Sequence, residues 1–238
     1  MSDAVAPARR YPRVGPHVHP AIRNSTYRSN TLRHPREPLV EIPPTVSELT
    51  GPATPFGPPA AGENDLTRQH AGEPLGERSI LAGRVLDEDG RPLPDTLVEI
   101  WQANAAGRYR HTLDTHQAPL DPNFSGTGRT LTDADGRWQF ITIMPGRYPW
   151  PNHYNAWRPA HIHFSLFGQN FLSRLVTQMY FPGDPLQRLD PVMNAVADRE
   201  SRDRLVCAFD IDLTQPDWAL GFRWDIVLRG RRATPMEP

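Results

Sequence analysis

Two histidines that stand one residue apart, His161 and His163, have the residue type and spacing of a metal site. Polar and apolar residues alternate through 160–166, which indicates a β-strand, and side chains two positions apart in a strand point to the same face. Both imidazoles would therefore reach one metal ion from that face. The pattern alone leaves a second interpretation open, in which the histidines are only hydrogen-bonded on a partly polar strand face.

Two tyrosines in predicted loops are candidates for further metal ligands. Tyr109 lies in the long irregular segment 104–124, and Tyr148 lies in a second such segment, 144–159. Long loops in a compact domain often carry functional residues. A phenolate is a hard anionic oxygen donor that suits Fe(III), and a trivalent ion favours loss of the phenol proton. For either tyrosine alone, the alternative is a packed loop aromatic with a solvated hydroxyl.

Short strands separated by turns predict the scaffold that must position these residues. We expect a short helix within 186–204 and strands at 80–86, 97–101, 137–143, 160–166, 175–181, 205–211 and 222–228. Asp and Gly gather in the turns between several of these segments. The spacing indicates an all-β protein, an antiparallel β-sandwich with long functional loops.

The composition of the chain changes at Gly76. Residues 1–75 are rich in proline and poor in hydrophobic periodicity, so they predict a proline-rich N-terminal arm that packs on a partner chain. A flexible tail is the alternative for this arm. Residues 76–238 predict the β-sandwich domain that carries the candidate site.

Length and composition exclude several classes of protein. The chain has 238 residues and a net charge of −1, with no basic stripe of the kind that binds nucleic acid. No apolar run has transmembrane length, and the first ten residues lack the apolar core of a signal peptide. The single cysteine, Cys207, excludes an internal disulfide and any multi-cysteine metal site. We therefore expect a cytoplasmic protein.

Four segments together resemble one known family. They are 97–111 with Tyr109, 118–124, 145–150 with Tyr148, and 157–164 with both histidines. In these segments the chain resembles the intradiol ring-cleaving dioxygenases, and the similarity extends over about residues 27–232. The resemblance implies a β-sandwich that holds one non-haem Fe(III) per chain, with Tyr109, Tyr148, His161 and His163 as its ligands.

The same resemblance implies roles for other residues. Arg158 matches a cation beside the metal, where it would stabilise negative charge that develops on the substrate. Tyr148 is expected to leave the metal and take a substrate proton, while Tyr109 stays bound. The positions that match the substrate pocket are Tyr27, Trp150, Gln178 and Val192.

The resemblance also implies partners. The metal-bearing β chain of such enzymes pairs with a homologous α chain that lacks the metal ligands, and αβ units assemble further. The small-molecule partners are a catechol and O2.

Three functions are compared for this chain: intradiol cleavage of a carboxylated catechol, cleavage of another catechol, or a non-catalytic β-sandwich binding module. A visible charge-transfer band from tyrosinate to Fe(III) would separate the enzymes from the binding module.

Overall fold

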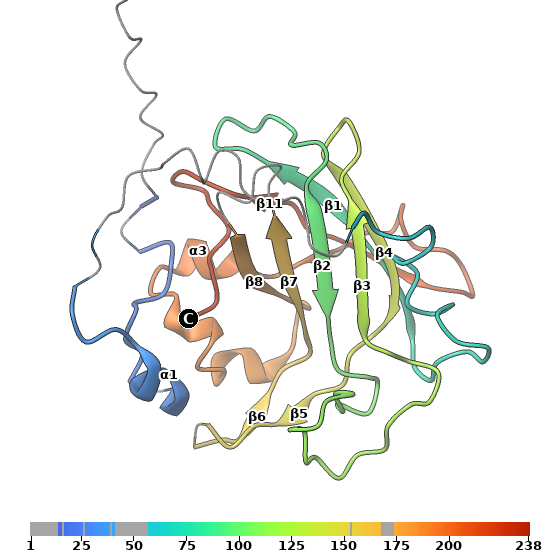
Figure 1. Ribbon diagram of the computed structural model, residues 1–238, viewed down its shortest axis with the longest axis horizontal. Coiled ribbons are helices and arrows are strands. Elements are labelled where there is room, and N and C mark those ends of the chain that lie inside the picture. Colours follow the sequence, from blue (N-terminus) through green and yellow to red (C-terminus); the bar gives the residue numbers. More distant parts are fainter. Residues whose placement is uncertain are drawn as a thin grey trace, which may run out of the picture.

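Two β-sheets pack face to face around one apolar core (Figure 1). The computed structural model describes residues 14–15, 17–25, 27–38, 40, 57–152, 154–167 and 174–238. Both sheets contribute to the core, with Ile162 and Phe164 from one sheet and Leu81 and Phe140 from the other, each at most 2% exposed. The predicted all-β sandwich is confirmed.

The first sheet carries the histidines, has the strand order β3-β2-β7-β8 and is antiparallel throughout. Its strands are β2 (Leu97–Trp101), β3 (Thr127–Leu131), β7 (His161–Phe167) and β8 (Arg174–Tyr180). The alternation predicted for 160–166 is confirmed, because Ile162, Phe164 and Leu166 are buried in the core. His161 and His163 consequently lie on the opposite face of β7.

The second sheet is built around one long strand, β1. Its strands are β1 (Arg78–Leu86), β4 (Arg137–Ile143), β9 (Ala208–Phe209), β10 (Leu220–Arg223) and β11 (Ile226–Val227). β4 pairs antiparallel with β1, as expected, but β10 and β11 pair parallel with it. The sheet is mixed because the chain reverses after β9 and enters β10 in the direction of β1.

Two predicted strands are shorter than the sequence pattern indicates. In 205–211, Cys207 N donates to Tyr180 O at 2.9 Å, so the beginning of this segment pairs with the first sheet and only β9 joins the second. The segment 222–228 is interrupted between β10 and β11, where the Asp225 side chain accepts a hydrogen bond from Arg84 N at 2.8 Å. A polar side chain thus takes the place of a backbone acceptor.

The helical prediction within 186–204 is confirmed as short pieces. They are the 3₁₀ turns η1 (Pro185–Arg188) and η2 (Met193–Ala195) and the helix α3 (Arg199–Asp203). The Asp198 side chain caps α3 by accepting a hydrogen bond from Ser201 N at 2.7 Å. Figure 1 shows these pieces beside β8.

Parts of the proline-rich arm pack on the sandwich of the same chain. Leu66 is fully buried in the core, and its backbone N donates to Ile141 O at 2.8 Å. Farther upstream, α1 (Arg28–Arg33) follows Tyr27, whose ring packs on Trp150. Residues 1–13 and 41–56 lie outside the described residues. The boundary at Gly76 and packing of the arm on a partner chain stay predictions.

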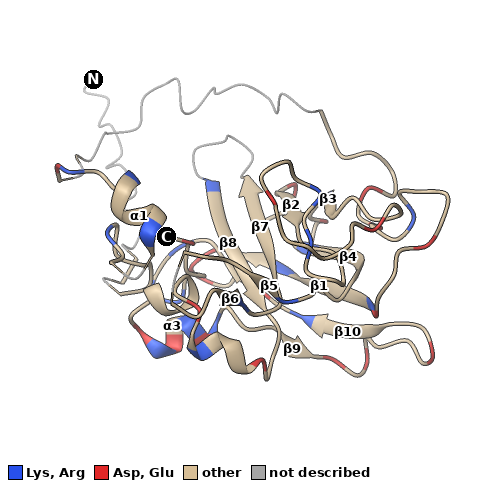
Figure 2. Cartoon of the chain, turned by 90° about the horizontal axis from the view of Figure 1, so that it is seen from below, with Lys and Arg blue, Asp and Glu red and all other residues tan. Residues whose placement is uncertain are grey.

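The small sheet that carries Tyr148 lies at one end of the sandwich (Figure 1). Its strands are β5 (Tyr148–Pro149) and β6 (Trp157–Arg158). In the described part of the chain, no helix has the length and apolar character needed to cross a membrane. Acidic and basic residues are interspersed along the visible elements (Figure 2).

Candidate metal centre

The two histidines of β7 are held by the strands on either side. Trp101 of β2 is opposite His163 in the sheet, and their rings stack at a centroid distance of 4.8 Å and an interplanar angle of 7°. On the other side, Tyr180 of β8 is opposite His161. The two imidazole rings are 5.0 Å apart. The strand geometry therefore brings both to one place, as the spacing predicts.

The structure brings both predicted tyrosines to these histidines. The Tyr148 hydroxyl oxygen lies 3.4 Å from His161 Nε2. The ring of Tyr109 lies edge-on to Tyr148 at 5.3 Å and is 6.3 Å from the ring of His163. Two phenols and two imidazoles thus form one cluster, although their positions in the sequence span more than fifty residues.

A tight loop after β2 delivers Tyr109. The Asn104 side-chain oxygen accepts hydrogen bonds from Ala106 N at 3.0 Å and Arg108 N at 2.9 Å, and so closes the turn. Gly107 has φ +78°, and a Cβ atom on it would lie 2.2 Å from the carbonyl oxygen of Arg147. Glycine is required here because the loop passes directly against the backbone beside Tyr148.

The hydrogen bonds of His161 indicate which ring nitrogen carries the proton and which keeps a lone pair for coordination. His161 Nδ1 lies 2.7 Å from Pro159 O, a carbonyl that can only accept, so Nδ1 carries the proton. The Nε2 lone pair then accepts a hydrogen bond from Arg158 Nη1 at 3.0 Å and also faces the Tyr148 hydroxyl. Burial lowers the pKa of both His161 and His163, and for His161 the nearby charge of Arg158 lowers the pKa further. Both imidazoles are therefore neutral, as metal ligands must be.

The Tyr109 hydroxyl is an unusual group for a protein interior. It is buried and has no hydrogen-bond partner among the residues that the structure describes. Burial raises the pKa of Tyr109 well above its ordinary value, and the neighbouring Tyr148 raises the pKa further. An unsatisfied buried hydroxyl is costly, so a partner that the protein chain does not supply fits this position.

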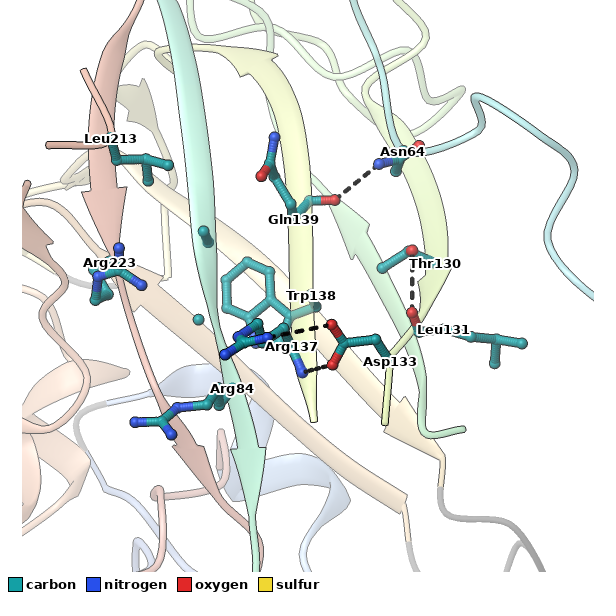
Figure 3. A pocket seen from close by; sticks show the side chains of 12 residues that line it. Asn64, Arg84, Thr130, Leu131, Asp133, Arg137, Trp138, Gln139, Leu213 and Arg223 are labelled. Atoms are coloured by element: carbon teal, nitrogen blue, oxygen red, sulfur yellow. Dashed lines mark hydrogen bonds and ion pairs between the residues drawn. The ribbon is translucent and has the colours of Figure 1, made fainter. Parts of the chain in front are cut away.

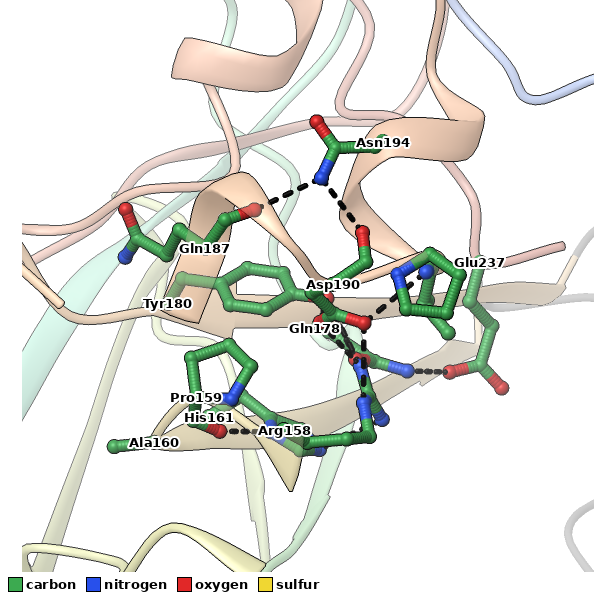
Figure 4. A network of polar contacts seen from close by, with 12 residues as sticks. Arg158, Pro159, Ala160, His161, Gln178, Tyr180, Gln187, Asp190, Asn194 and Glu237 are labelled. Atoms are coloured by element: carbon green, nitrogen blue, oxygen red, sulfur yellow. Dashed lines mark hydrogen bonds and ion pairs between the residues drawn. The ribbon is translucent and has the colours of Figure 1, made fainter. Parts of the chain in front are cut away.

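Arg158 is the centre of a buried polar network (Figure 4). Its guanidinium donates to both carboxylate oxygens of Asp190, at 2.8 and 3.3 Å, and to Gln178 Oε1 at 2.6 Å. The side chains of Arg158 and Asp190 are 3% and 0% exposed. Burial alone would lower the pKa of Arg158, but the Asp190 charge outweighs it and the pKa is raised. Arg158 is therefore a permanent cation, with Nη1 3.3 Å from the Tyr148 hydroxyl.

A cavity of about 850 Å³ opens at the cluster. Tyr109, Tyr148, His163 and Trp150 are among the residues that line it. The ring of Tyr27 packs against Trp150 at 4.9 Å. Trp150 therefore lines the cavity and Tyr27 contacts Trp150, while the substrate-binding roles of both stay predictions.

Gln178 and Val192 lie behind the cluster instead of in the lining of this cavity. Gln178 is 4% exposed and is hydrogen-bonded to Arg158. Val192 is 7% exposed, and its backbone N donates to Asp190 at 3.1 Å. Both predicted pocket residues therefore contact the Arg158 network, and their role toward a substrate stays a prediction.

A second cavity, of about 710 Å³, is lined by residues of β1, β3, β4 and β10 (Figure 3). Its arginines are paired with nearby carboxylates, as in Arg223 with Asp210 at 2.6 Å and Arg84 with Asp225 at 3.9 Å. None of the four clustered residues lines it. The second cavity is therefore separate from the candidate site.

Sequence reasoning missed three residues that hold the site. Tyr180 contacts Asp190 and Arg158 through its hydroxyl, at 3.0 and 3.1 Å, and Glu237 contacts His163. Tyr180 follows Gln178 by two positions in β8, so the alternation of that strand could have indicated it. Asp190 and Glu237 lie in irregular segments, where no local pattern marks them.

Comparisons with known proteins agree with this arrangement. A family model described as "Dioxygenase" matches residues 49–230. The protocatechuate 3,4-dioxygenase beta chain of Burkholderia cepacia is 55% identical over 92% of this chain and 94% of its own length. The protocatechuate 3,4-dioxygenase alpha chain of Pseudomonas putida is 28% identical over 83% of this chain and 97% of its own length.

Among solved structures, 3-chlorocatechol 1,2-dioxygenase from Rhodococcus opacus is similar with a TM-score of 0.55 and 28% identity, covering 75% of this chain and 70% of that one. The chain therefore belongs to the family of intradiol ring-cleavage dioxygenases. It is an enzyme of the oxidoreductase class, as the sequence resemblance implied.

Proposed function

We propose that this chain is the metal-bearing chain of a protocatechuate 3,4-dioxygenase, which cleaves 3,4-dihydroxybenzoate with O2 to 3-carboxy-cis,cis-muconate. The observation that carries the proposal is the convergence of Tyr109, Tyr148, His161 and His163 in one cluster, of which all but His161 line the cavity. The identity of 55% to a protocatechuate 3,4-dioxygenase beta chain supports this substrate.

The four side chains fit one Fe(III) per chain, and the family depends on iron. Two phenolates and two neutral imidazoles form a mixed hard oxygen and nitrogen donor set, which suits a trivalent ion. The buried Tyr109 hydroxyl, with no protein partner among the described residues, supports a metal in contact with it. When bound, the ion would supply Lewis acidity toward a catechol and withdraw electron density from its ring.

The two tyrosines are proposed to have different roles. Tyr148 is only partly buried and lines the cavity, and its hydroxyl is within 3.3 Å of Arg158. Tyr148 would hold the metal through an oxygen that can also accept a catechol proton, and Arg158 would stabilise the phenolate charge of that oxygen. Tyr109 is also partly buried and lines the cavity, but its hydroxyl oxygen is buried, which supports its role as the ligand that stays bound.

Arg158 also supports charge on the substrate. Its guanidinium lies over the Trp150 ring at 5.2 Å, and Trp150 lines the cavity. A catechol beside Trp150 would meet a fixed cation that needs no reorganisation during the reaction. Asp190 and Gln178 hold this cation in place, so they are positioning residues.

The test combines metal analysis with product analysis. Purified wild-type protein should contain one iron per chain, show a broad visible band and convert protocatechuate to the ring-opened dicarboxylate. His161→Ala and His163→Ala should lose both iron and the band, whereas His17→Ala, a change at an exposed histidine, should retain them. Full iron occupancy in both ligand variants would refute the ligand assignment. Faster turnover of an unsubstituted or sulfonated catechol would favour the second candidate function.

A homologous α chain is the proposed protein partner, and αβ units would assemble further. The support is the identity to a beta chain together with the detectable similarity to an alpha chain. The chain should be expressed alone and together with an α chain, and size and substrate selectivity compared. A fully active, protocatechuate-selective species formed by this chain alone would show that the partner is unnecessary. A cytoplasmic location also stays a prediction.

A further inference from the structure

The segment that follows β11 returns along the edge of β8. Thr177 Oγ1 donates to Pro235 O at 2.6 Å, and Glu237 N donates to Val176 O at 3.0 Å. Met236 N donates to His19 Nδ1 at 3.1 Å, so this segment, 233–237, is also tied to the upstream arm. These contacts hold the backbone of the segment without using the Glu237 side chain.

The Glu237 side chain points from this segment into the polar network of the site (Figure 4). Its Oε2 accepts a hydrogen bond from Gln178 Nε2 at 2.7 Å and lies 3.3 Å from His163 Nδ1. The Glu237 carboxylate is 28% exposed and lies beside the ring of His163.

The two histidines consequently have unlike partners. His161 donates from Nδ1 to a neutral carbonyl, that of Pro159, at 2.7 Å. His163 has a carboxylate at the corresponding nitrogen. A carboxylate on the outer nitrogen of an imidazole fixes its tautomer, restricts its rotation and makes the other nitrogen a stronger donor.

We propose that Glu237 is a positioning residue, which orients His163 and strengthens it as a ligand through a carboxylate–histidine–metal arrangement. The inference rests on the proposed function, in which His163 binds iron. Under this proposal, a residue 74 positions from His163 in the sequence influences how tightly the site binds its metal. The stacked Trp101 ring limits the other motions of His163, so the carboxylate sets the remaining orientation of the ring.

The test compares Glu237→Gln and Glu237→Ala with wild type and with two controls. Glu237→Gln keeps the size and a hydrogen-bond acceptor but removes the charge. Glu200→Gln makes the same chemical change at a side chain of α3 that is 82% exposed. Thr177→Val removes the contact with Pro235 and leaves the Glu237 carboxylate in place.

Two quantities are measured on each purified holoprotein, and one on each apoprotein. On the holoprotein these are the rate at which iron is lost to an excess of chelator and the wavelength of the visible band. On the apoprotein it is the melting temperature. Glu237→Ala should lose iron at least about 10-fold faster than wild type, within the range for loss of such outer contacts, and Glu237→Gln should lose it several-fold faster. Both bands should move to longer wavelength, because a weaker imidazole donor leaves the ferric ion more electron-poor. Glu200→Gln should match wild type.

The outcomes separate this proposal from the function on which it rests. Wild-type protein without iron or a visible band would refute the proposed function itself. Iron-loaded wild type with Glu237 variants of unchanged release rate and band would overturn only the role of Glu237. Release rates that merely follow apoprotein melting temperature, with Thr177→Val as fast as Glu237→Gln, would also overturn it, because they would make Glu237 an anchor of the segment.

Discussion

The Tyr109 hydroxyl is buried without a hydrogen-bond partner among the described residues, whereas the Tyr148 hydroxyl contacts Arg158 and His161. The two phenols therefore contribute differently to the stability of the metal-free protein. A buried polar group that lacks a partner costs free energy, and a metal ion would repay that cost only when bound.

Replacing Tyr109 by Phe should stabilise the apoprotein while it impairs iron binding. The change removes an unsatisfied buried hydroxyl, so the free energy of unfolding should rise by about 1 kcal/mol. Tyr148→Phe is the matched control, and because its hydroxyl is hydrogen-bonded it should not stabilise the apoprotein. Denaturant unfolding of both apoproteins, with iron analysis of the holoproteins, checks this. Equal changes in unfolding free energy would contradict it.

Asp190 should be essential because it neutralises the buried Arg158. Asp190→Ala leaves a cation of 3% exposure without its carboxylate, and breaking a buried pair in this way costs about 3–5 kcal/mol. Arg158→Met alone should also destabilise, because it leaves Asp190 unpaired. A double-mutant cycle measured by denaturant unfolding should show that the combined loss is well below the sum of the two single losses. Simple additivity would mean that the pair is not coupled.

At the scale of elements, two glycine-containing turns show what positions the site. Gly107 and Gly90 have nearly the same φ, +78° and +79°. A Cβ atom on Gly90 would meet nothing within 4 Å, whereas one on Gly107 would meet the Arg147 carbonyl at 2.2 Å. The backbone conformation is matched in the two turns, and only the close approach differs.

Gly107→Ala should therefore damage the site, whereas Gly90→Ala should only cost stability. A left-handed alanine costs about 1–2 kcal/mol in either turn. Gly107→Ala adds a clash with backbone, worth about 1–3 kcal/mol more, and separates Tyr109 from Tyr148. Thermal unfolding and iron content measure the two effects. Full iron occupancy in Gly107→Ala would show that the loop tolerates the shift.

At the scale of the whole molecule, the buried histidines couple stability to pH. Burial lowers the pKa of His161 and His163 below the ordinary value of 6.5. In the unfolded chain both regain that value, so below it the unfolded state binds more protons than the folded apoprotein. Their contribution to stability is complete above pH 6.5 and is lost as the pH falls below it.

The free energy of unfolding of the apoprotein should fall between pH 6.5 and 5 by up to about 1.4 kcal/mol per pH unit for each histidine. His161→Gln should reduce this slope, and His17→Gln, at an exposed position, should not. Denaturant titrations at several pH values give the slopes directly. Parallel slopes for wild type and His161→Gln would contradict the assignment of a neutral buried histidine.

The sequence by itself determined the features that depend on local patterns. Alternation through 160–166 placed His161 and His163 on one face of a strand because side-chain direction in a strand repeats every two residues. Asp and Gly at 133–136 marked a turn, where Gly136 has φ +70°. The resemblance of whole segments then identified Tyr109, Tyr148 and Arg158, which no periodicity could have related to the histidines.

Only the tertiary structure decided the features that depend on contacts between distant segments. The parallel pairing of β10 with β1 depends on the path of the chain after β9, which strand patterns do not encode. Asp190 and Glu237 contact Arg158 and His163 from irregular segments 32 and 74 positions away. A buried charge needs its partner wherever the fold places it, and the position of that partner is a property of packing in three dimensions, not of sequence spacing.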